Sequence, residues 1–410
     1  MTRRAWLALL GGGLILTLAM GVRQTFGLLL SPMSVELGIS REAFGLALAI
    51  QNLLWGAAQP FAGLLADRFG TGRAILAGTL AYASGVALMA GAGDALDLML
   101  GAGIMVGLGL SGVSFAVVLG AVGKAVPDET RSMALGIAAA GGSFGQFVMA
   151  PIGQTLISAQ GWSGALMAMA VLSLAMAPLS LLLAGPGAKP HPTAGRDLGR
   201  LSLGIGEALG EAARYPSFWY LILGFFVCGF QVVFIGVHLP AYLNDLGFSP
   251  AVGATALALI GFFNIIGTYG CGALGARFSK KSLLAVLYAL RSGVIVVFLL
   301  APKTEAVVMI FAAAIGVLWL GTVPLTSGLV AQIFGVQYLS MLFGIAFFSH
   351  QIGSFLGVWL GGWVFDSTGS YDAIWIASIA LGLLAALVNL PIIERPLRPE
   401  VVGEAAPLSR

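Results

Sequence analysis

Two arginines and one histidine lie deep inside long apolar stretches of the chain, where ionisable side chains are rare. A second histidine, His238, lies near the end of its stretch and is expected to be an interfacial or gate residue. Arg23 lies in AWLALLGGGLILTLAMGVRQTFGLLL, Arg291 in YALRSGV and His350 in FFSHQIGSF. A charge at the centre of a lipid bilayer costs about 2.5–3.5 kcal/mol on insertion scales. We therefore expect each of these residues to have a role that explains its position.

The acidic residues are distributed differently from these two arginines. All 17 Asp and Glu residues fall in loops, tails or the ends of apolar stretches, with Asp67 and Asp366 at stretch edges. The apolar interior thus holds two permanent positive charges and no permanent negative charge. A cavity with this balance attracts an anion, and a planar guanidinium fits the two oxygens of a carboxylate particularly well.

Each of the three residues also has a structural interpretation. Arg23 could bind backbone carbonyls or extend to the membrane surface instead of binding substrate. Arg291 could be a substrate ligand, or a structural and gating partner of nearby polar residues. Neutral His350 could hydrogen-bond a carboxylate and carry a proton, or it could be satisfied by a neighbouring helix.

Uncharged polar residues inside the apolar stretches form a second group of candidates. Each could bind substrate or could connect two helices by a hydrogen bond. They are Gln24, Asn52, Gln146, Gln231, Asn264, Tyr269, Thr322 and Gln351.

The composition indicates that a membrane protein positions these residues. Of 410 residues, 59% are hydrophobic and only 9% are charged, whereas soluble domains carry about 25% charged residues. The 59 glycines fit close helix packing in lipid, and rows such as Gly353, Gly357 and Gly361 predict packing surfaces. The net charge of +3 comes from short basic loops and does not indicate nucleic acid as a partner.

Other kinds of site are not indicated. The two cysteines, Cys228 and Cys271, lie in apolar stretches, and no metal-ligand spacing occurs. The glycine-rich LGAGIMVGLGLSG lies in an apolar stretch with no strand before it, so it is not read as a dinucleotide-binding loop. We expect no metal, no cofactor and no enzymatic activity, because neither a nucleophile–base set nor a nucleotide motif is present.

Apolar stretches long enough to cross a bilayer, about 20 residues each, recur twelve times. They predict an all-α membrane protein, because transmembrane barrels have short alternating strands instead. The chain begins like a signal peptide, MTRRAWLALL, but no clear cleavage site precedes Arg23, so we predict an uncleaved first helix. The predicted spans are 6–30, 44–66, 74–92, 97–122, 133–157, 163–184, 217–240, 250–274, 282–301, 305–333, 341–364 and 372–393.

Basic residues predict the orientation of the spans. With the N-terminus in the cytoplasm, 16 Lys and Arg residues fall in cytoplasmic segments, and only Arg41 and Lys303 fall in outer loops. We therefore expect an integral protein of the cytoplasmic (inner) membrane with both termini in the cytoplasm.

One long polar interval predicts the domain organisation. Residues 185–216 begin Pro- and Gly-rich and become amphipathic, which is typical of a cytoplasmic linker that ends in a surface helix. The linker would join an N-terminal six-helix bundle, 1–184, to a C-terminal one, 217–395. A cytoplasmic tail, 396–410, would follow.

The two predicted bundles share a weak repeat. GLLADRFG at 63–70 is similar to GALGARFS at 272–279, about 209 residues later, although Ala276 replaces the acid. Paired bundles are typical of secondary transporters, which bind substrate near the midplane between them.

The repeat also carries a family resemblance. GLLADRFGTGR resembles the loop signature between helices two and three of the major facilitator superfamily, with Asp67, Arg68, Gly70 and Arg73 at its positions. PDETRSMALGI and GGSFGQFVMAPIG also resemble that superfamily. The resemblance implies twelve helices in two pseudo-symmetric halves. It also implies that the four loop residues form a conformational latch, in which Asp67 pairs with Arg68, Arg73 or a helix end.

Within the superfamily, GVRQTFGLLLSPM resembles the bacterial branch of the monocarboxylate and oxalate:formate transporters. The resemblance implies that Arg23 serves a carboxylate site. Two features depart from the animal monocarboxylate transporters. The acidic-glycine signature of their first helix is absent, and their Asp…Arg pair of helix eight would fall near Asn264 and Thr268.

The expected function is secondary transport of a small organic anion, a monocarboxylate for preference, by alternating access. Arg23 would hold the carboxylate, with Arg291 and His350 in support. Transport would be proton symport or anion exchange, in a monomer surrounded by lipid. The alternatives are an efflux carrier for apolar or cationic molecules and a non-transporting sensor on the same fold.

Overall fold

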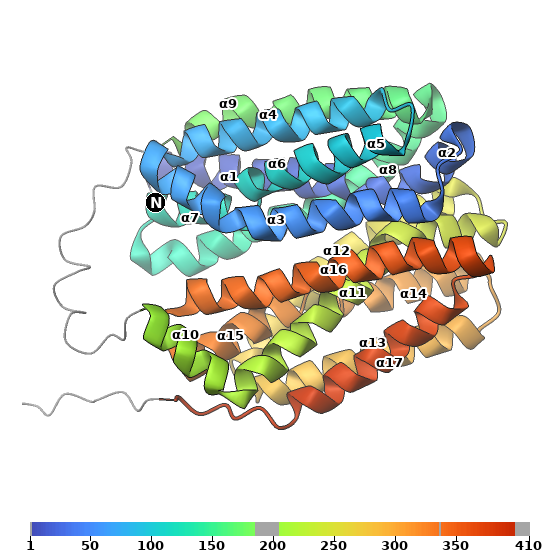
Figure 1. The fold of residues 1–410 in the computed structure, drawn as a ribbon. Coiled ribbons are helices and arrows are strands. Elements are labelled where there is room, and N and C mark those ends of the chain that lie inside the picture. Colours follow the sequence, from blue (N-terminus) through green and yellow to red (C-terminus); the bar gives the residue numbers. More distant parts are fainter. Residues whose placement is uncertain (1, 185–204, 336–337, 398–410) are drawn as a thin grey trace, which may run out of the picture.

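The computed structural model describes residues 2–184, 205–335 and 338–397, and these residues form helices that run side by side (Figure 1). The predicted linker, 185–216, is described only from Ile205 onward. Most of the predicted tail, 396–410, lies outside the described residues.

The first half of the chain contains nine α-helices, one π-helical segment and one 3-10 segment within the described residues. They are α1 (Arg3–Gln24), α2 (Phe26–Leu37), α3 (Arg41–Phe69), α4 (Thr71–Ala90), α5 (Ala95–Leu98), π-helical η1 (Met99–Met105), α6 (Val106–Val113), α7 (Phe115–Ala125), α8 (Asp128–Leu174), α9 (Met176–Ser180) and 3-10 η2 (Leu181–Leu183).

The second half begins with a short helix beside the bundle and continues with long ones. Its described helices are α10 (Ile205–Arg214), α11 (Pro216–Asp245), α12 (Pro250–Gly275), α13 (Lys280–Leu300), α14 (Glu305–Val317), α15 (Thr322–Phe334), α16 (Leu339–Thr368) and α17 (Asp372–Asn389).

The all-α fold with twelve spans is confirmed. Within the described residues, ten stretches are long and apolar enough to cross a membrane. One of them, 133–183, holds two crossings that meet at Gly161, where φ is +73°. The remaining crossing is α3, which is absent from the ten because polar residues lower its hydropathy. Gln51 and Asn52 are among these residues, so the helix that hydropathy misses carries candidate site residues.

Two spans are interrupted near their middle. The span 95–125 breaks at Ser114, between α6 and α7, and the span 305–334 breaks over residues 318–321, between α14 and α15. A break in lipid frees backbone N–H and C=O groups, and these need partners inside the protein. At the second break, side chains from neighbouring helices supply such partners, as described below.

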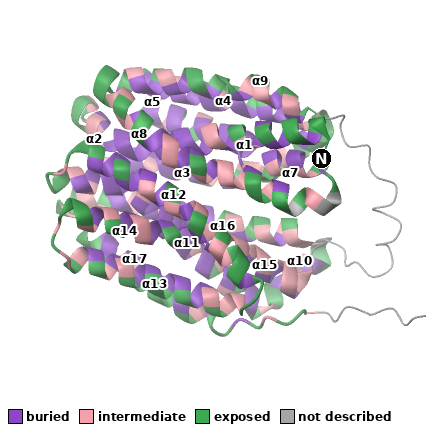
Figure 2. Cartoon of the chain, turned by 180° about the vertical axis from the view of Figure 1, so that it is seen from behind, coloured by how far each residue is buried: buried purple, intermediate pink, exposed green. Residues whose placement is uncertain are grey.

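Each half has its own apolar core. One core is drawn almost entirely from α1 to α9, and the other almost entirely from α11 to α17. Buried residues follow the inner faces of the helices, and exposed residues lie mainly on the outer faces (Figure 2). Many of the exposed residues are large and apolar, such as Leu10, Phe61, Val297 and Leu300, as expected for a surface in contact with lipid.

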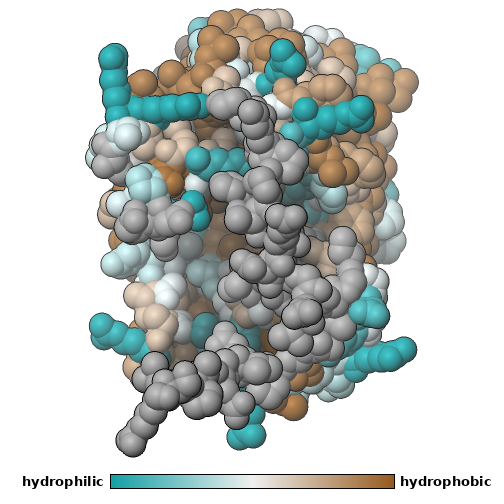
Figure 3. Space-filling view, turned by 90° about the vertical axis from the view of Figure 1, so that its left-hand side faces the viewer, coloured by the Kyte–Doolittle hydropathy of each residue, from teal (hydrophilic) through white to brown (hydrophobic). Residues whose placement is uncertain are grey.

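The N-terminus and α10 lie at one end of the helices, which we name the linker end because α10 follows the predicted linker (Figure 1). Seen from this end, hydrophilic side chains project at several places on the face, and hydrophobic ones are concentrated along its upper edge (Figure 3). We name the opposite end, where α2 ends and α3 begins, the far end. The polar ends and apolar sides match a bundle that spans a bilayer.

The predicted glycine packing surface on α16 is confirmed. A Cβ atom added at Gly353 or Gly357 would overlap the carbonyl oxygens of Phe226 and Phe230 on α11. The absence of side chains at these positions therefore lets the two backbones touch.

Replacing Gly353 with Ala is expected to destabilise the protein, because the methyl group must displace the α11 backbone. Overpacking of this kind costs about 1–3 kcal/mol. Thermal unfolding of the protein in detergent measures it. Gly344→Ala, on the same helix but with open space around its Cβ position, is the matched control and should leave the midpoint unchanged or raised. Equal midpoints for both variants would contradict this packing.

Candidate functional site

Arg23 lies in the last turn of α1 and reaches toward α3. Its Nε donates to Gln51 Oε1 at 3.3 Å, and its Nη2 donates to Asn52 Oδ1 at 2.7 Å. The guanidinium carbon is 5.2 Å from the ring centroid of Trp55, which is one turn along the same helix. The partners of Arg23 are therefore side chains of a neighbouring helix, not backbone carbonyls or the membrane surface. It is held by three side chains of α3.

The partners of Arg23 are neutral. The ion pairs among the described residues are Arg41–Asp245 and Lys124–Asp67, and neither includes Arg23. The amide nitrogens of Gln51 and Asn52 are engaged elsewhere, so only their oxygens face the guanidinium. The positive charge of Arg23 is thus hydrogen-bonded but not neutralised.

One edge of the guanidinium stays available. Nε and Nη2 donate to the two amides, whereas Nη1 has no hydrogen bond within the described residues and is not among the buried unpaired atoms. A guanidinium has five N–H groups, and the edge formed by Nη1 and the second hydrogen of Nη2 can bind both oxygens of a carboxylate. This is the geometry that an anion site requires.

Arg291 carries the same charge as Arg23 but lies in a different environment. It is fully buried on α13, and its Nη1 donates to Gln231 Oε1 at 3.1 Å. Its Nη2 donates to the carbonyls of Leu318 and, at 2.8 Å, of Trp319. These carbonyls lie in the break between α14 and α15. Arg291 thus supplies the hydrogen bonds that the interrupted helix has lost.

Asn264, on α12, binds a backbone group of the same break. Its Oδ1 accepts the backbone N–H of Leu320 at 3.1 Å and the Thr268 hydroxyl at 3.0 Å. Its Nδ2 donates to Ser143 Oγ on α8 at 3.0 Å, which connects the two halves. Asn264, Gln231 and Arg291 thus form one hydrogen-bonded group around the break, and in this conformation that group is structural.

His350 packs within its own half, where its ring centroid is 4.9 Å from that of Phe225 on α11, and Arg23 is not among its contacts. Its Nδ1 is 3.2 Å from Gln351 Oε1 and 3.4 Å from Ser354 Oγ, all on α16. Its ring stacks on Phe347 with centroids 5.9 Å apart, and Phe347 meets Trp55 edge-on at 5.6 Å. Aromatic rings therefore connect His350 to the α3 residue that covers Arg23.

Three further candidates each keep a buried polar atom without a hydrogen-bond partner among the described atoms. These atoms are Gln24 Nε2, Gln146 Oε1 and Gln351 Nε2. Buried polar atoms are usually paired, so a free one can accept a ligand or a water. Gln146 packs against Gly261 and Gln351 against Gly56, both across the boundary between the halves.

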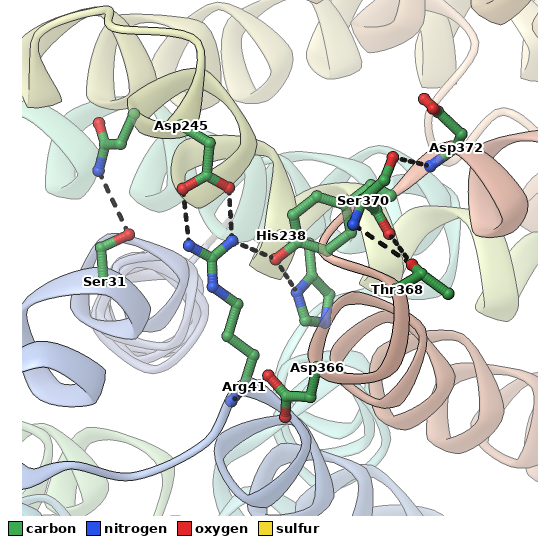
Figure 4. A network of polar contacts seen from close by, with 10 residues as sticks. Ser31, Arg41, His238, Asp245, Asp366, Thr368, Ser370 and Asp372 are labelled. Atoms are coloured by element: carbon green, nitrogen blue, oxygen red, sulfur yellow. Dashed lines mark hydrogen bonds and ion pairs between the residues drawn. The ribbon is translucent and has the colours of Figure 1, made fainter.

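The far end is closed by a polar network that the sequence did not predict (Figure 4). Arg41, the first residue of α3, binds both oxygens of Asp245 on α11 at 2.6 and 2.7 Å. Asp366 of α16 accepts the backbone N–H groups of Arg41 at 3.2 Å and Glu42 at 2.6 Å. Trp359 Nε1 donates to Glu42 Oε1 at 3.1 Å. The start of α3 is thus fastened to two helices of the other half.

His238 extends this network into α11. Its Nε2 must donate to the carbonyl of Val358, 2.8 Å away, because a carbonyl only accepts. Its Nδ1 then accepts from the Tyr371 hydroxyl at 3.1 Å, while Tyr371 accepts from Arg41 Nη1 at 2.9 Å. Burial raises the pKa of Tyr371. Its hydroxyl therefore keeps the proton that it donates to His238 Nδ1. We name Arg41, Asp245, Asp366, Tyr371 and His238 the far-end gate.

Comparison with known proteins decides the family. The profile of the Major Facilitator Superfamily matches residues 12–325. The chain belongs to the major facilitator superfamily. Its relatives include monocarboxylate transporter 13 of Bos taurus, 25% identical over 393 residues that cover 94% of this chain and 89% of that protein. The oxalate:formate antiporter of Oxalobacter formigenes is 23% identical over 408 residues, covering 97% and 94%.

The fold comparison agrees. A bacterial homologue of the human lysosomal transporter Spinster, solved in an inward-facing and unoccupied conformation, superposes with a TM-score of 0.75 at 17% identity, covering 95% of this chain and 97% of that one. The resemblance of this chain to the superfamily, and to its monocarboxylate and oxalate:formate branch, is confirmed. Its relatives are transporters, not enzymes.

The superfamily loop signature has a different partner from the predicted one. Asp67 pairs with Lys124 of α7 at 2.8 Å rather than with Arg68 or Arg73, because α7 ends beside the end of α3. Arg68 lies over the ring of Phe69. Both members of the pair are exposed and belong to one half. The latch role of these residues and of Gly70, which turns the chain with φ of +94°, stays a prediction.

Sequence reasoning missed Gln51, Trp55 and every residue of the far-end gate except His238, which it expected to be an interfacial or gate residue. Gln51 precedes the predicted candidate Asn52, and the position of both in a stretch of low hydropathy was a usable signal. For the gate, the signal was Arg41 itself, one of two basic residues in predicted outer loops. Its partner, Asp245, is 204 positions away, and nothing in one sequence connects them.

Replacing Arg291 with Met is expected to lower the unfolding midpoint strongly, because two carbonyls of the broken helix lose their donor. An unsatisfied buried group costs about 1–3 kcal/mol. Thermal unfolding of the detergent-purified variant measures this. Arg277→Met, at an exposed position beyond α12, is the control and should unfold as the wild type does. An unchanged midpoint in Arg291→Met would exclude the structural role.

Proposed function

We propose that the protein is a secondary active transporter of a small organic anion, with a monocarboxylate as the expected substrate. The observation that carries this proposal is the environment of Arg23. Its charge is held by neutral amides, and one edge of its guanidinium is free to bind both oxygens of a carboxylate. The names of relatives, monocarboxylate transporter and oxalate:formate antiporter, support the same substrate class.

In this proposal the candidate residues have separate roles. Arg23 binds the carboxylate, and Asn52 holds Arg23. The unpaired amide N–H groups of Gln24 and Gln351, together with neutral His350, donate hydrogen bonds to the substrate, whereas the unpaired oxygen of Gln146 accepts from a substrate hydroxyl. Three further candidates surround the break between α14 and α15: Arg291, Gln231 and Asn264. They stabilise the helices at this break, and they contact the substrate only in another conformation.

The protein would work by alternating access in the cytoplasmic (inner) membrane. We assign the linker end, with both termini, to the cytoplasm, and the far end to the outside, because 16 basic residues lie on the first side and two on the second. The far-end gate then closes the outer path in the conformation described here. The protein is proposed to act as a monomer, with Asp67, Arg68, Gly70 and Arg73 as a latch at the cytoplasmic end.

Two coupling mechanisms fit the same site. No acidic residue lies in the middle of a span, so the sequence offers no fixed carboxylate to carry a proton. In anion exchange, the substrate by itself neutralises the charge of Arg23. In proton symport, the substrate enters together with a proton that His350 carries. Loading vesicles with unlabelled anion, or imposing a pH gradient without it, separates exchange from symport.

The proposal predicts that Arg23→Gln lowers carboxylate uptake at least about tenfold, because a hydrogen bond to a charged group contributes about 1.5–3 kcal/mol. The measurement is uptake of labelled formate, lactate and oxalate into proteoliposomes. Arg4→Gln, an exposed residue in the first turn of the same helix, is the matched control and should transport normally.

The uptake results test the substrate class and the role of Arg23 separately. Normal uptake by Arg23→Gln would reject the site while leaving the substrate class. Uptake of organic cations with none of the three anions would favour the alternative, an efflux carrier for apolar or cationic molecules. Binding of an anion without any uptake would favour a non-transporting sensor on the same fold.

Opening of the far-end gate can be followed separately. Arg41→Gln removes the pair with Asp245, so the outer path should open more often. With the native cysteines replaced by Ser and Ser31, on α2 near the gate, replaced by Cys, a membrane-impermeant maleimide should react several-fold faster in the Arg41→Gln background.

Lys303→Gln is the matched control for this experiment. Lys303 is the other basic residue of the far end, but it donates to the carbonyls of Phe298, Leu299 and Ala301 at the end of its own helix. It should therefore leave the labelling rate unchanged. Equal acceleration by both variants would mean that only net charge matters, and would contradict the gate.

A further inference from the structure

Gln51 is held in place through both its side-chain amide and its backbone. Its Nε2 donates to the carbonyl of Ala102 at 2.9 Å. Ala102 belongs to η1, the seven-residue π-helical segment, and such segments recur at functional sites of proteins. The amide nitrogen is thereby fixed, so the amide oxygen has to face Arg23.

The backbone of Gln51 is fixed as well. A Cβ atom at Gly107 would come within 2.9 Å of the Gln51 carbonyl oxygen and 3.1 Å of its Cα, and one at Gly103 within 3.1 Å of the Ala47 carbonyl oxygen. Glycines on η1 and α6 therefore let α3 pack directly on that segment. Gln51 itself is 1% exposed, so both ends of this residue are set by its packing.

The chemistry of the side chain matters as much as its position. A glutamate has the same length and would bind Arg23 more strongly, as an ion pair. It could not donate to Ala102, however, and its charge would compete with an incoming carboxylate for the guanidinium. Asn52, tied to the carbonyl of Leu48 at 2.7 Å, repeats the arrangement. Two neutral acceptors hold Arg23 where two acids would have cancelled its charge.

We infer that Gln51 is a positioning and specificity residue of the anion site, which orients Arg23 through its amide oxygen while leaving the charge of Arg23 for the substrate. This inference rests on the proposed function, because it specifies why that site selects anions. Gln51 itself contacts Arg23 and does not contact the substrate.

Two measurements test the inference. The first is a thermal double-mutant cycle on the full-length protein in detergent, with Gln51→Glu and Gln51→Met made in the wild type and in Arg23→Met. With Arg23 present, Gln51→Glu should unfold at a higher temperature than Gln51→Met, because Glu pairs with the guanidinium. With Arg23 removed, the order should reverse, because the glutamate is then buried without a partner.

The second measurement is the KM for uptake of the best of the three labelled anions, formate, lactate or oxalate. Gln51→Glu should raise the KM at least tenfold with a maximal rate within about threefold of the wild type. Gln51→Met should raise it much less, because Asn52 still holds Arg23. Gln59→Glu, about 12 Å further along α3, carries the same change and should keep the wild-type KM.

The outcomes are distinct. The same order of midpoints in both backgrounds would show that residue 51 does not reach Arg23, and would overturn the inference. A normal KM in Gln51→Glu would overturn it too, as would equal KM values for Glu and Met. If the wild type takes up none of the three anions, the proposed function fails, and the thermal cycle alone decides whether Gln51 holds Arg23.

Discussion

A polar group inside a membrane must find its hydrogen-bond partner within the protein, and this constraint explains the surroundings of both intramembrane arginines. Both guanidinium NH2 groups of Arg291 meet it, although its Nε has no partner within the described residues. Its partners are two carbonyls of an interrupted helix and a buried glutamine, so the charge stabilises a break in the backbone. Arg23 meets it along one edge, which two amides hold, while the edge that includes Nη1 has no further partner among the described residues. The same residue type is structural in one half and available in the other.

The two halves solve the problem of a broken helix in parallel ways. The interval of 209 residues between the loop repeats also relates Trp55 to Asn264 and Tyr82 to Arg291. Trp55 Nε1 donates to Ser114 at the break in the first half, and Asn264 accepts from Leu320 at the break in the second. Tyr82 donates to a carbonyl of α1, and Arg291 donates to carbonyls of the second break. Trp55 and Asn264 thus both contact the break of their own half, whereas Tyr82 binds the continuous helix α1 and Arg291 binds the second break.

These pairs show what the sequence could and could not predict. The spans, the paired halves and the superfamily follow from hydropathy and short motifs, because lipid imposes length and composition on every crossing. The absence of an intramembrane acid predicted that Arg23 keeps its charge, and the neutral contacts agree with that prediction. The duty of Arg291 could not be predicted, because it depends on a break at residues 318–321 that carries no proline or charge. The far-end gate depends on residues that meet only in the folded chain.

The location of each partner also indicates which contacts survive when the halves move. Arg23 and Arg291 each bind residues of their own half, so rigid-body rocking leaves both groups intact. Arg41 binds Asp245 and Tyr371 of the opposite half, and these contacts must break for the far end to open. The bond from Asn264 to Ser143 also crosses the boundary, and it connects the break in the second half to α8. The same helix, α3, begins at Arg41 and carries Gln51 and Asn52, so a substrate on Arg23 can influence the gate along α3 itself. The Trp55–Phe347 contact adds a route across the boundary, because it joins the cover of Arg23 to α16.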